Sequence, residues 1–175
     1  MKNLIFGFVF IIFSAFTVAA QTDEARLIDE FGKLPCGDFE SRMNLIRIES
    51  QNSPDSKIYV VYYGGRFRKE YLLNKKTNNP DKVQLKYPHR EDGLNWAKSI
   101  PLYLTTEETY PAAIRDSLKA KIILINGGFR EDIAVEIWLV PKDAKPPKPT
   151  PAIEEKHIKF KGKPRSVPNF TTCYN

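Results

Sequence analysis

The feature that most limits the fold is a run of β-branched and aromatic residues without a polar interruption, Ile58–Tyr63. Such a run is typical of a strand in the interior of a sheet, because a strand with one solvated face alternates apolar and polar residues. Gly64 and Gly65 close it. Two further runs, Lys121–Ile125 and Ala134–Val140, predict two more strands, and the short connection between them predicts antiparallel neighbours.

Helical periodicity precedes the first of these strands and recurs between the first and the second. We expect Asp38 to cap a helix that ends at Ser53, with apolar residues spaced four and three apart. The residues of that stripe are Phe39, Met43 and Ile46. Asp92 is expected to cap a second helix that ends at Leu104 and is kinked by Pro101. Helix, strand, helix, strand, strand together predict a two-layer α+β domain.

The first twenty residues are typical of a cleavable secretory signal. Lys2 precedes an apolar run, Leu4–Phe13, and a stretch of small residues then leads to Ala20. We expect cleavage after Ala20, so that residues 1–20 are a signal peptide and the mature protein is exported to the periplasm or the cell exterior. An N-terminal membrane anchor is the alternative, but the run is shorter than the roughly 20 residues that cross a bilayer. No membrane span is expected after cleavage.

Charge and proline content divide the mature chain into two parts. Residues 21–141 contain 18 basic and 18 acidic side chains, whereas residues 142–175 contain eight basic and three acidic ones. Repeated prolines in Pro141–Pro151 are expected to hold an extended, polyproline-type spacer. We therefore predict one domain over 21–141 and a basic, Pro-rich C-terminal tail over 142–175. A neutral body in an exported protein argues against nucleic-acid binding.

Two basic segments have less definite assignments. In His157–Lys163 basic and apolar residues alternate, which predicts either an edge strand or a solvated arm that contacts an anionic surface. We favour the arm, because a net charge of +5 in the tail is modest. Residues 66–90 are polar and basic with a turn at Asn78–Asp81, and we expect them to form a surface insertion.

The chain contains only two cysteines, Cys36 and Cys173. An exported protein meets an oxidising compartment, so we predict an intramolecular disulfide between them. By the chain-entropy account such a bond stabilises the fold by roughly 4 to 5 kcal/mol, and it would hold the tail against the start of the domain. Two free thiols or an intermolecular bridge are the alternatives.

The usual sequence patterns of catalytic and metal sites do not occur. His89 and His157 are the only histidines, and neither has the spacing of metal ligands. The sequence has no nucleophile elbow, no phosphate-binding glycine loop and no dinucleotide motif. We interpret His89, Glu91 and Asp92 as a polar loop rather than an acid/base cluster. The prediction is a protein that is not an enzyme and carries no cofactor or metal.

A polar cluster after the second apolar run supplies the candidate binding residues. The turn between two core strands displays Arg130 and Glu131 on a rigid base, next to Phe129. With Arg66, which follows the earlier strand, these residues form the candidate site. For the turn itself we favour the simpler interpretation, a charged turn that keeps the sheet edge soluble. Four aromatic residues either line a glycan-stacking surface or fill the core: Tyr59, Tyr62, Tyr63 and Trp138.

The order of the elements resembles the OmpA-like domain of bacterial envelope proteins, over roughly Ala25–Pro141. The segments that carry the resemblance are Leu27–Phe31, Ile58–Gly64, Ala97–Leu104, Ile122–Gly128 and Val135–Ile137. It implies a βαβαββ sandwich of helices on a small mixed sheet, with peptidoglycan as the ligand. The chain also resembles a group of short exported bacterial proteins that share a turn and strand like Gly127–Trp138.

In OmpA-like domains an Asp after the second strand and an Arg that opens the second helix bind the peptidoglycan stem peptide. Together they match the ammonium and carboxylate ends of diaminopimelate. The corresponding positions here are residues 64–67 and Trp96, where neither charge is present. Loss of both charges should remove most of the specific binding.

We therefore expect a non-enzymatic envelope protein with a binding or structural role. Its partner would be an envelope protein, or peptidoglycan bound through a relocated site that uses, for instance, Arg66 or Arg130. A small exported hydrolase is the less supported alternative.

Overall fold

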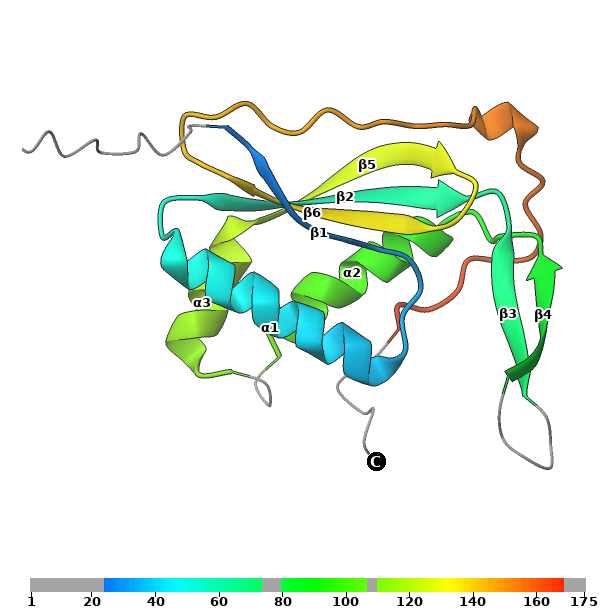
Figure 1. Ribbon diagram of the computed structural model, residues 1–175, viewed down its shortest axis with the longest axis horizontal. Helices are drawn as coiled ribbons and strands as arrows, with labels where there is room; N and C mark the ends of the chain where they lie inside the picture. The colour runs from blue at the N-terminus through cyan, green and yellow to red at the C-terminus, as the bar shows by residue number, and fades with distance from the viewer. Residues whose placement is uncertain (1–23, 74–79, 107–109, 169–175) are drawn as a thin grey trace, which may run out of the picture.

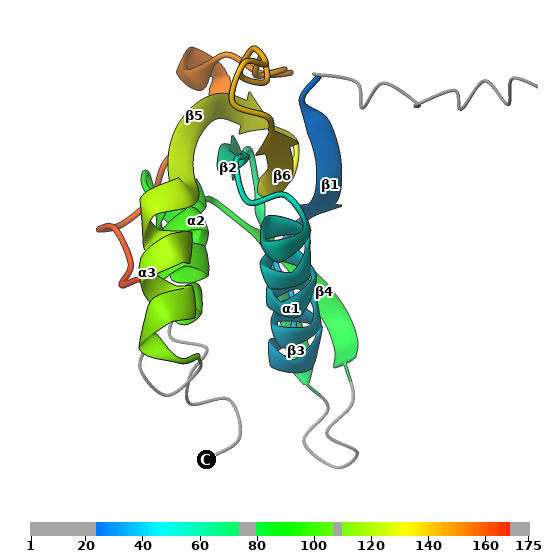
Figure 2. The ribbon, with the colours of Figure 1, turned by 90° about the vertical axis from the view of Figure 1, so that its left-hand side faces the viewer.

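The computed structural model of the chain describes residues 24–73, 80–106 and 110–168. Four strands form a mixed sheet in the spatial order β1, β6, β2, β5. Their bounds are Arg26–Phe31 for β1, Lys57–Gly65 for β2, Ile122–Arg130 for β5 and Ala134–Val140 for β6. Helices α1 (Cys36–Asn52), α2 (Asp92–Leu104) and α3 (Ala112–Lys121) lie on one face of this sheet (Figures 1 and 2). The predicted α+β class is confirmed.

Strand β2 has the interior position that its apolar run predicts. It pairs with β5 in parallel on one side and with β6 in antiparallel fashion on the other. Ile58 and Val60 belong to the core beneath the helices, and Val61 and Tyr63 point to the opposite face. All four side chains are fully buried. Burial on both faces requires apolar residues at consecutive positions, which explains the uninterrupted run.

The prediction that the last two strands are antiparallel neighbours is wrong. Strand β2 lies between β5 and β6 in the sheet. The chain passes through α2 and α3 before β5, and this crossover connection places β5 parallel to β2. Strand β6 then pairs with the other edge of β2. Pairing of both strands with the apolar β2 therefore prevails over the tendency of strands that follow each other in sequence to pair directly.

Both predicted aspartate caps are misplaced. The N-cap of α1 is Pro35, so Asp38 lies inside the first turn. The N-cap of α2 is Glu91, and Asp92 is the first helical residue. Its Oδ2 accepts a hydrogen bond of 2.9 Å from the backbone N–H of His89. Carboxylates in a first turn still interact favourably with the helix dipole, which accounts for acidic residues there without capping.

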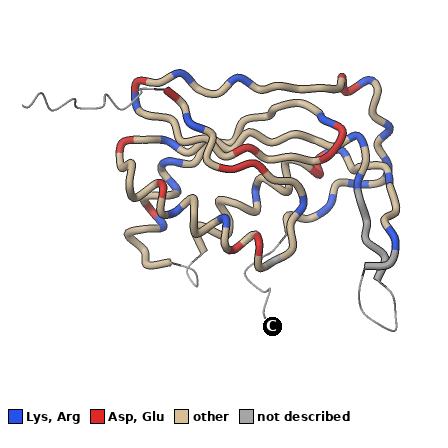
Figure 3. Tube along the Cα trace, viewed as in Figure 1, with Lys and Arg blue, Asp and Glu red and all other residues tan. Residues whose placement is uncertain are grey.

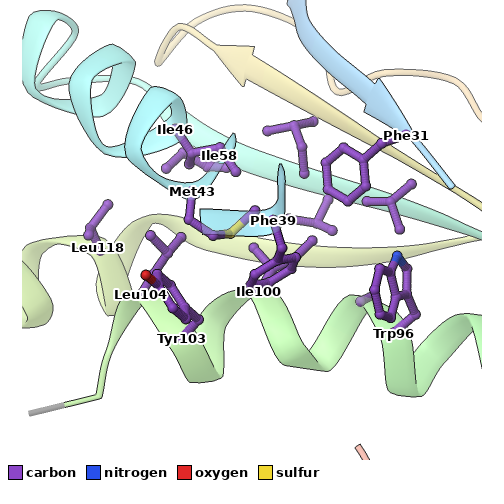
Figure 4. Close-up of a cluster of buried hydrophobic side chains, with 14 of the residues drawn as sticks. Phe31, Phe39, Met43, Ile46, Ile58, Trp96, Ile100, Tyr103, Leu104 and Leu118 are labelled. Carbon is purple, nitrogen blue, oxygen red and sulfur yellow. The ribbon is translucent and has the colours of Figure 1, made fainter. Parts of the chain in front are cut away.

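The main core lies between the sheet and the helices (Figure 4). Phe39 of α1 packs edge-to-face against Trp96 and Tyr103 of α2, with ring centroids 6.0 and 5.5 Å apart. The predicted stripe of α1 is confirmed, because Phe39, Met43 and Ile46 are all fully buried. This core holds α2, and with it Trp96, in a fixed place against the sheet.

The tail covers the face of the sheet that the helices leave open (Figures 1 and 2). Ile153 forms a bridge with Phe129 of β5, and Pro147 and Ile158 are buried. The ring of Phe160 lies 5.8 Å from that of Phe129. The favoured interpretation of His157–Lys163 as a solvated arm is therefore wrong, because alternate apolar residues of the segment anchor it to the domain.

The described part of the segment 66–90 contains a separate two-stranded sheet. Strand β3 (Arg68–Leu73) pairs with β4 (Pro80–Lys86) in antiparallel fashion, and neither strand joins the main sheet. This β3–β4 hairpin projects from one end of the domain (Figure 1). The predicted turn at Asn78–Asp81 lies partly outside the described residues.

Replacement of Gly93 by alanine is expected to lower the free energy of unfolding by about 1 to 3 kcal/mol. In an exposed helix the same change stabilises by about 1 kcal/mol. A Cβ at Gly93, however, would lie only 2.9 Å from the backbone oxygen of Tyr63 and 3.0 Å from the nitrogen of Gly64. Chemical denaturation measures the change, with Lys98→Ala on the exposed side of α2 as the control. A more stable Gly93→Ala variant would contradict the tight contact of α2 with β2.

Two predictions from the sequence fall outside the described residues. Residues 1–20 and Cys173 are not among them, so the signal peptide and the disulfide stay predictions. In the described part of the chain, no helix combines the length and the apolar character that a membrane crossing requires.

Candidate functional site

Arg130, at the end of β5, is the centre of a charged network. Its Nη1 donates to Oε1 of Glu30 at 2.8 Å, and its Nη2 donates to Oγ1 of Thr150 at 2.7 Å and to the carboxylate of Glu136. The guanidinium carbon lies 3.6 Å from the ring centroid of Tyr63. Burial by itself would lower the pKa of Arg130, but the hydrogen bond with Glu136 and the nearby carboxylates raise it above the ordinary value.

Glu136 of β6 is a buried carboxylate whose two oxygens are both hydrogen-bonded. Oε2 accepts from the Tyr63 hydroxyl at 3.2 Å and from the Trp138 indole N–H at 3.0 Å, while Oε1 accepts from Arg130. The Tyr63 oxygen accepts the backbone N–H of Thr150 at 3.1 Å. Buried charges persist when they are paired and hydrogen-bonded in this way. The network therefore ties β2, β5 and β6 to the tail.

The four predicted binding residues lie close together, but they do not share one role. Arg66 and Glu131 form an exposed ion pair of 3.3 Å, and the backbone N–H of Arg66 donates to the oxygen of Arg130 at 2.9 Å. Phe129 packs on Phe160 of the tail. Arg130 points inward to the network described above. The internal partners of Arg130 leave its guanidinium fewer donors for a ligand. A ligand-binding role for this group stays a prediction.

A pocket of about 520 Å³ lies at the start of α2. Its apolar walls come from four separate parts of the chain: Leu34 after β1, Trp96 of α2, Ile133 before β6 and Pro168 of the tail. The volume falls within the range of roughly 300 to 1,000 Å³ that is typical of small-molecule sites.

The charged groups of this pocket include both signs. Lys33, Arg68 and Arg165 contribute cationic side chains, and Asp92, which is 9% exposed, contributes a carboxylate. Asn95 Nδ2 donates to the backbone oxygen of Arg165 at 2.6 Å, which fixes the tail at the pocket. An apolar pocket with a few charged groups has the composition of a ligand site.

The sequence did not indicate these residues as a group. Lys33, Arg68, Asp92 and Arg165 belong to four segments that no local periodicity or spacing connects. The one available signal was the resemblance, which placed the missing ligand arginine at Trp96, and Trp96 lines the pocket. The cationic side chains of the pocket come from other segments, at Lys33, Arg68 and Arg165.

Among the described residues, no three side chains of His, Cys, Asp or Glu gather closely enough to hold a metal ion. No protein family, curated protein or solved structure matches this chain. Function is therefore inferred from the chemistry of the pocket and the surfaces around it.

Proposed function

We propose that this chain is an exported, non-enzymatic binding protein of the cell envelope. In this proposal the pocket at Trp96 binds a zwitterionic amino-acid group, such as the free end of a peptidoglycan stem peptide. The observation that carries it is the presence of one carboxylate and several cations in a single apolar-walled pocket. The domain would then be a degenerate OmpA-like domain in which the charged side chains that bind the ligand lie at new positions.

Each charged group has a partner in such a ligand. Asp92 would accept hydrogen bonds from the ligand ammonium group, and Arg165 and Lys33 would donate to its carboxylate. Hydrogen bonds between charged groups are roughly twice as strong as neutral ones, and a guanidinium matches a carboxylate with two parallel bonds. Trp96 and Ile133 would cover the aliphatic part of the ligand, as in other small-molecule sites.

The architecture supports the OmpA-like part of the proposal. The described chain has the helices on one face of a mixed sheet, and without the β3–β4 hairpin and α3 its elements follow the order β, α, β, α, β, β. The β3–β4 hairpin, α3 and the docked tail are additions to that order. The tail matters to the proposed site, because it supplies Arg165 and Pro168.

Arg165→Gln is expected to weaken binding of the tripeptide L-Ala-γ-D-Glu-meso-diaminopimelate about 10- to 100-fold. This range corresponds to the loss of one hydrogen bond to a charged group, about 1.5 to 3 kcal/mol. Calorimetric titration measures the dissociation constant. Amidation of the diaminopimelate carboxylates should weaken the tripeptide similarly, since it removes the charge that Arg165 would bind.

Arg66→Gln is the matched control, because Arg66 is a nearby exposed arginine that does not line the pocket. Equal loss of affinity in both variants, or equal affinity for the charged and amidated peptides, would contradict the assignment to this pocket. Retention on purified peptidoglycan sacculi at moderate salt, without binding of the tripeptide, would place recognition on the glycan strands instead.

A further inference from the structure

The β3–β4 hairpin presents an apolar stripe to solvent. Val83, Leu85 and Tyr87 alternate along β4 and its end, so they lie on one face of the strand. Their exposed fractions are 55, 57 and 41%. Single exposed apolar residues are ordinary, but three in a row on one face form a patch of the kind that marks an interaction surface.

The main sheet does not extend to this hairpin. Strands β3 and β4 form a two-stranded sheet outside the main one. An isolated two-stranded hairpin is marginally stable in water, and packing of its apolar face against another surface is what ordinarily stabilises it. The stripe is therefore suited to a surface outside this domain.

Basic side chains of the tail lie beside the stripe. Lys159, Lys161 and Lys163 belong to the run 156–168, which contains no acidic residue. Lys159 Nζ lies 5.1 Å from the ring centroid of Tyr87, and the backbone N–H of Lys161 donates to the oxygen of Pro88 at 3.0 Å. These contacts fix the basic run beside the hairpin (Figure 3).

A cavity of about 620 Å³ separates the two segments. Its walls include Phe67, Leu85 and Tyr87 together with the cationic Lys86 and Lys161. Leu85 and Tyr87 of the stripe and Lys161 of the tail therefore border the same cavity.

We propose that this surface, defined as Val83, Leu85 and Tyr87 with Lys159 and Lys161 of the tail, docks on an anionic phospholipid surface. Apolar side chains enter the boundary between head groups and acyl chains, while lysines contact lipid phosphates. Charge complementarity identifies the occupant as anionic, and the aliphatic Val83 and Leu85 require an apolar layer, which a polysaccharide does not offer. The surface is independent of the peptide pocket, because none of the groups assigned to the ligand there belongs to it.

The test is sedimentation of the full mature chain with vesicles of phosphatidylglycerol and phosphatidylcholine in equal parts, and with pure phosphatidylcholine vesicles. We expect binding to the anionic vesicles that persists in part at about 0.15 M salt, where surface charges are screened beyond roughly 8 Å. The double variant Val83→Ser, Leu85→Ser should lower the partition coefficient at least about tenfold, because burial of either side chain is worth that factor. Lys159→Gln with Lys161→Gln should remove the preference for anionic vesicles.

Leu102→Ser is the matched control, since Leu102 of α2 is 47% exposed on a different element. An equal loss in this variant, or no binding to anionic vesicles by the unmodified chain, overturns the proposal. Binding to heparin that the Val83 and Leu85 changes leave intact and the lysine changes abolish, without vesicle binding, also overturns it in favour of a polyanion site. The tripeptide titration of the same variants should be unchanged, which separates this proposal from the proposed function.

Discussion

Arg130→Ala is expected to lower the free energy of unfolding by about 3 to 5 kcal/mol, because it removes one partner of a buried ion pair and leaves the other charge in place. Arg130 is 19% exposed and Glu136 only 8%. The truncation also removes the donors to Glu30 and Thr150 and the contact with the Tyr63 ring. Glu136 would keep only the two hydrogen bonds from neutral donors.

Urea denaturation of the full mature chain measures this loss. Arg66→Ala provides the comparison, because the exposed pair of Arg66 with Glu131 should contribute at most about 1 kcal/mol. A double-mutant cycle of Arg130→Ala with Glu136→Gln isolates the coupling between the two side chains. If Arg130→Ala costs no more than Arg66→Ala, the network does not stabilise the fold as inferred.

The same variant should loosen the tail. Thr150 makes hydrogen bonds with the network through three of its groups. Its hydroxyl accepts from Arg130 Nη2, its backbone N–H donates to the Tyr63 oxygen, and its backbone oxygen accepts from Arg130 Nε at 3.4 Å. Loss of Arg130 therefore removes two of the hydrogen bonds that hold Thr150 on the sheet, while the one from its backbone N–H to the Tyr63 oxygen remains. Hydrogen exchange in residues 150–160 should rise more than exchange in β2, since local opening exposes the segments with the fewest remaining contacts first.

Replacement of Cys36 and Cys173 together by serine is expected to lower the free energy of unfolding by roughly 4 to 5 kcal/mol, the chain-entropy value for a loop of more than a hundred residues. The described part of the tail supports the pairing. Pro168, its last described residue, lines the same pocket as Leu34, which is two positions before Cys36. The five residues from Pro168 to Cys173 reach at most about 17 Å, so the approach of the tail to α1 makes the bond geometrically possible.

Alkylation and mass spectrometry of the unreduced, denatured protein count its free thiols, and denaturation with and without a reductant measures the stability. Single Cys36→Ser and Cys173→Ser variants should lose as much stability as the double variant, and reduced unmodified protein should match all three. Two free thiols in the unreduced protein would show the prediction to be wrong. A disulfide-linked dimer would instead support the intermolecular alternative.

Local sequence patterns determined the elements and part of their burial. The apolar run of β2 predicted an interior strand, and the spacing of Phe39, Met43 and Ile46 predicted the buried stripe of α1. Both succeed because each residue's neighbours along the chain fix which face of a strand or helix it occupies. The α+β class follows from the same elements.

Tertiary structure alone decided what those elements contact. Arg130 and Glu131 are adjacent in the turn that the sequence indicated, yet Arg130 turns inward to Glu30, one hundred positions away. The segment His157–Lys163 was expected to be a solvated arm, but Ile158 anchors it to the domain.

The pocket of the proposed function was equally hidden, because its charged residues come from separate segments of the chain. Periodicity and turn chemistry act over a few residues, so the sequence by itself determined the elements, their apolar faces and the α+β class. The order of the strands, the position of the tail and the composition of the pocket depend on which exposed edges and faces meet in space. Only the folded chain decides those contacts, because they join residues that no local pattern relates.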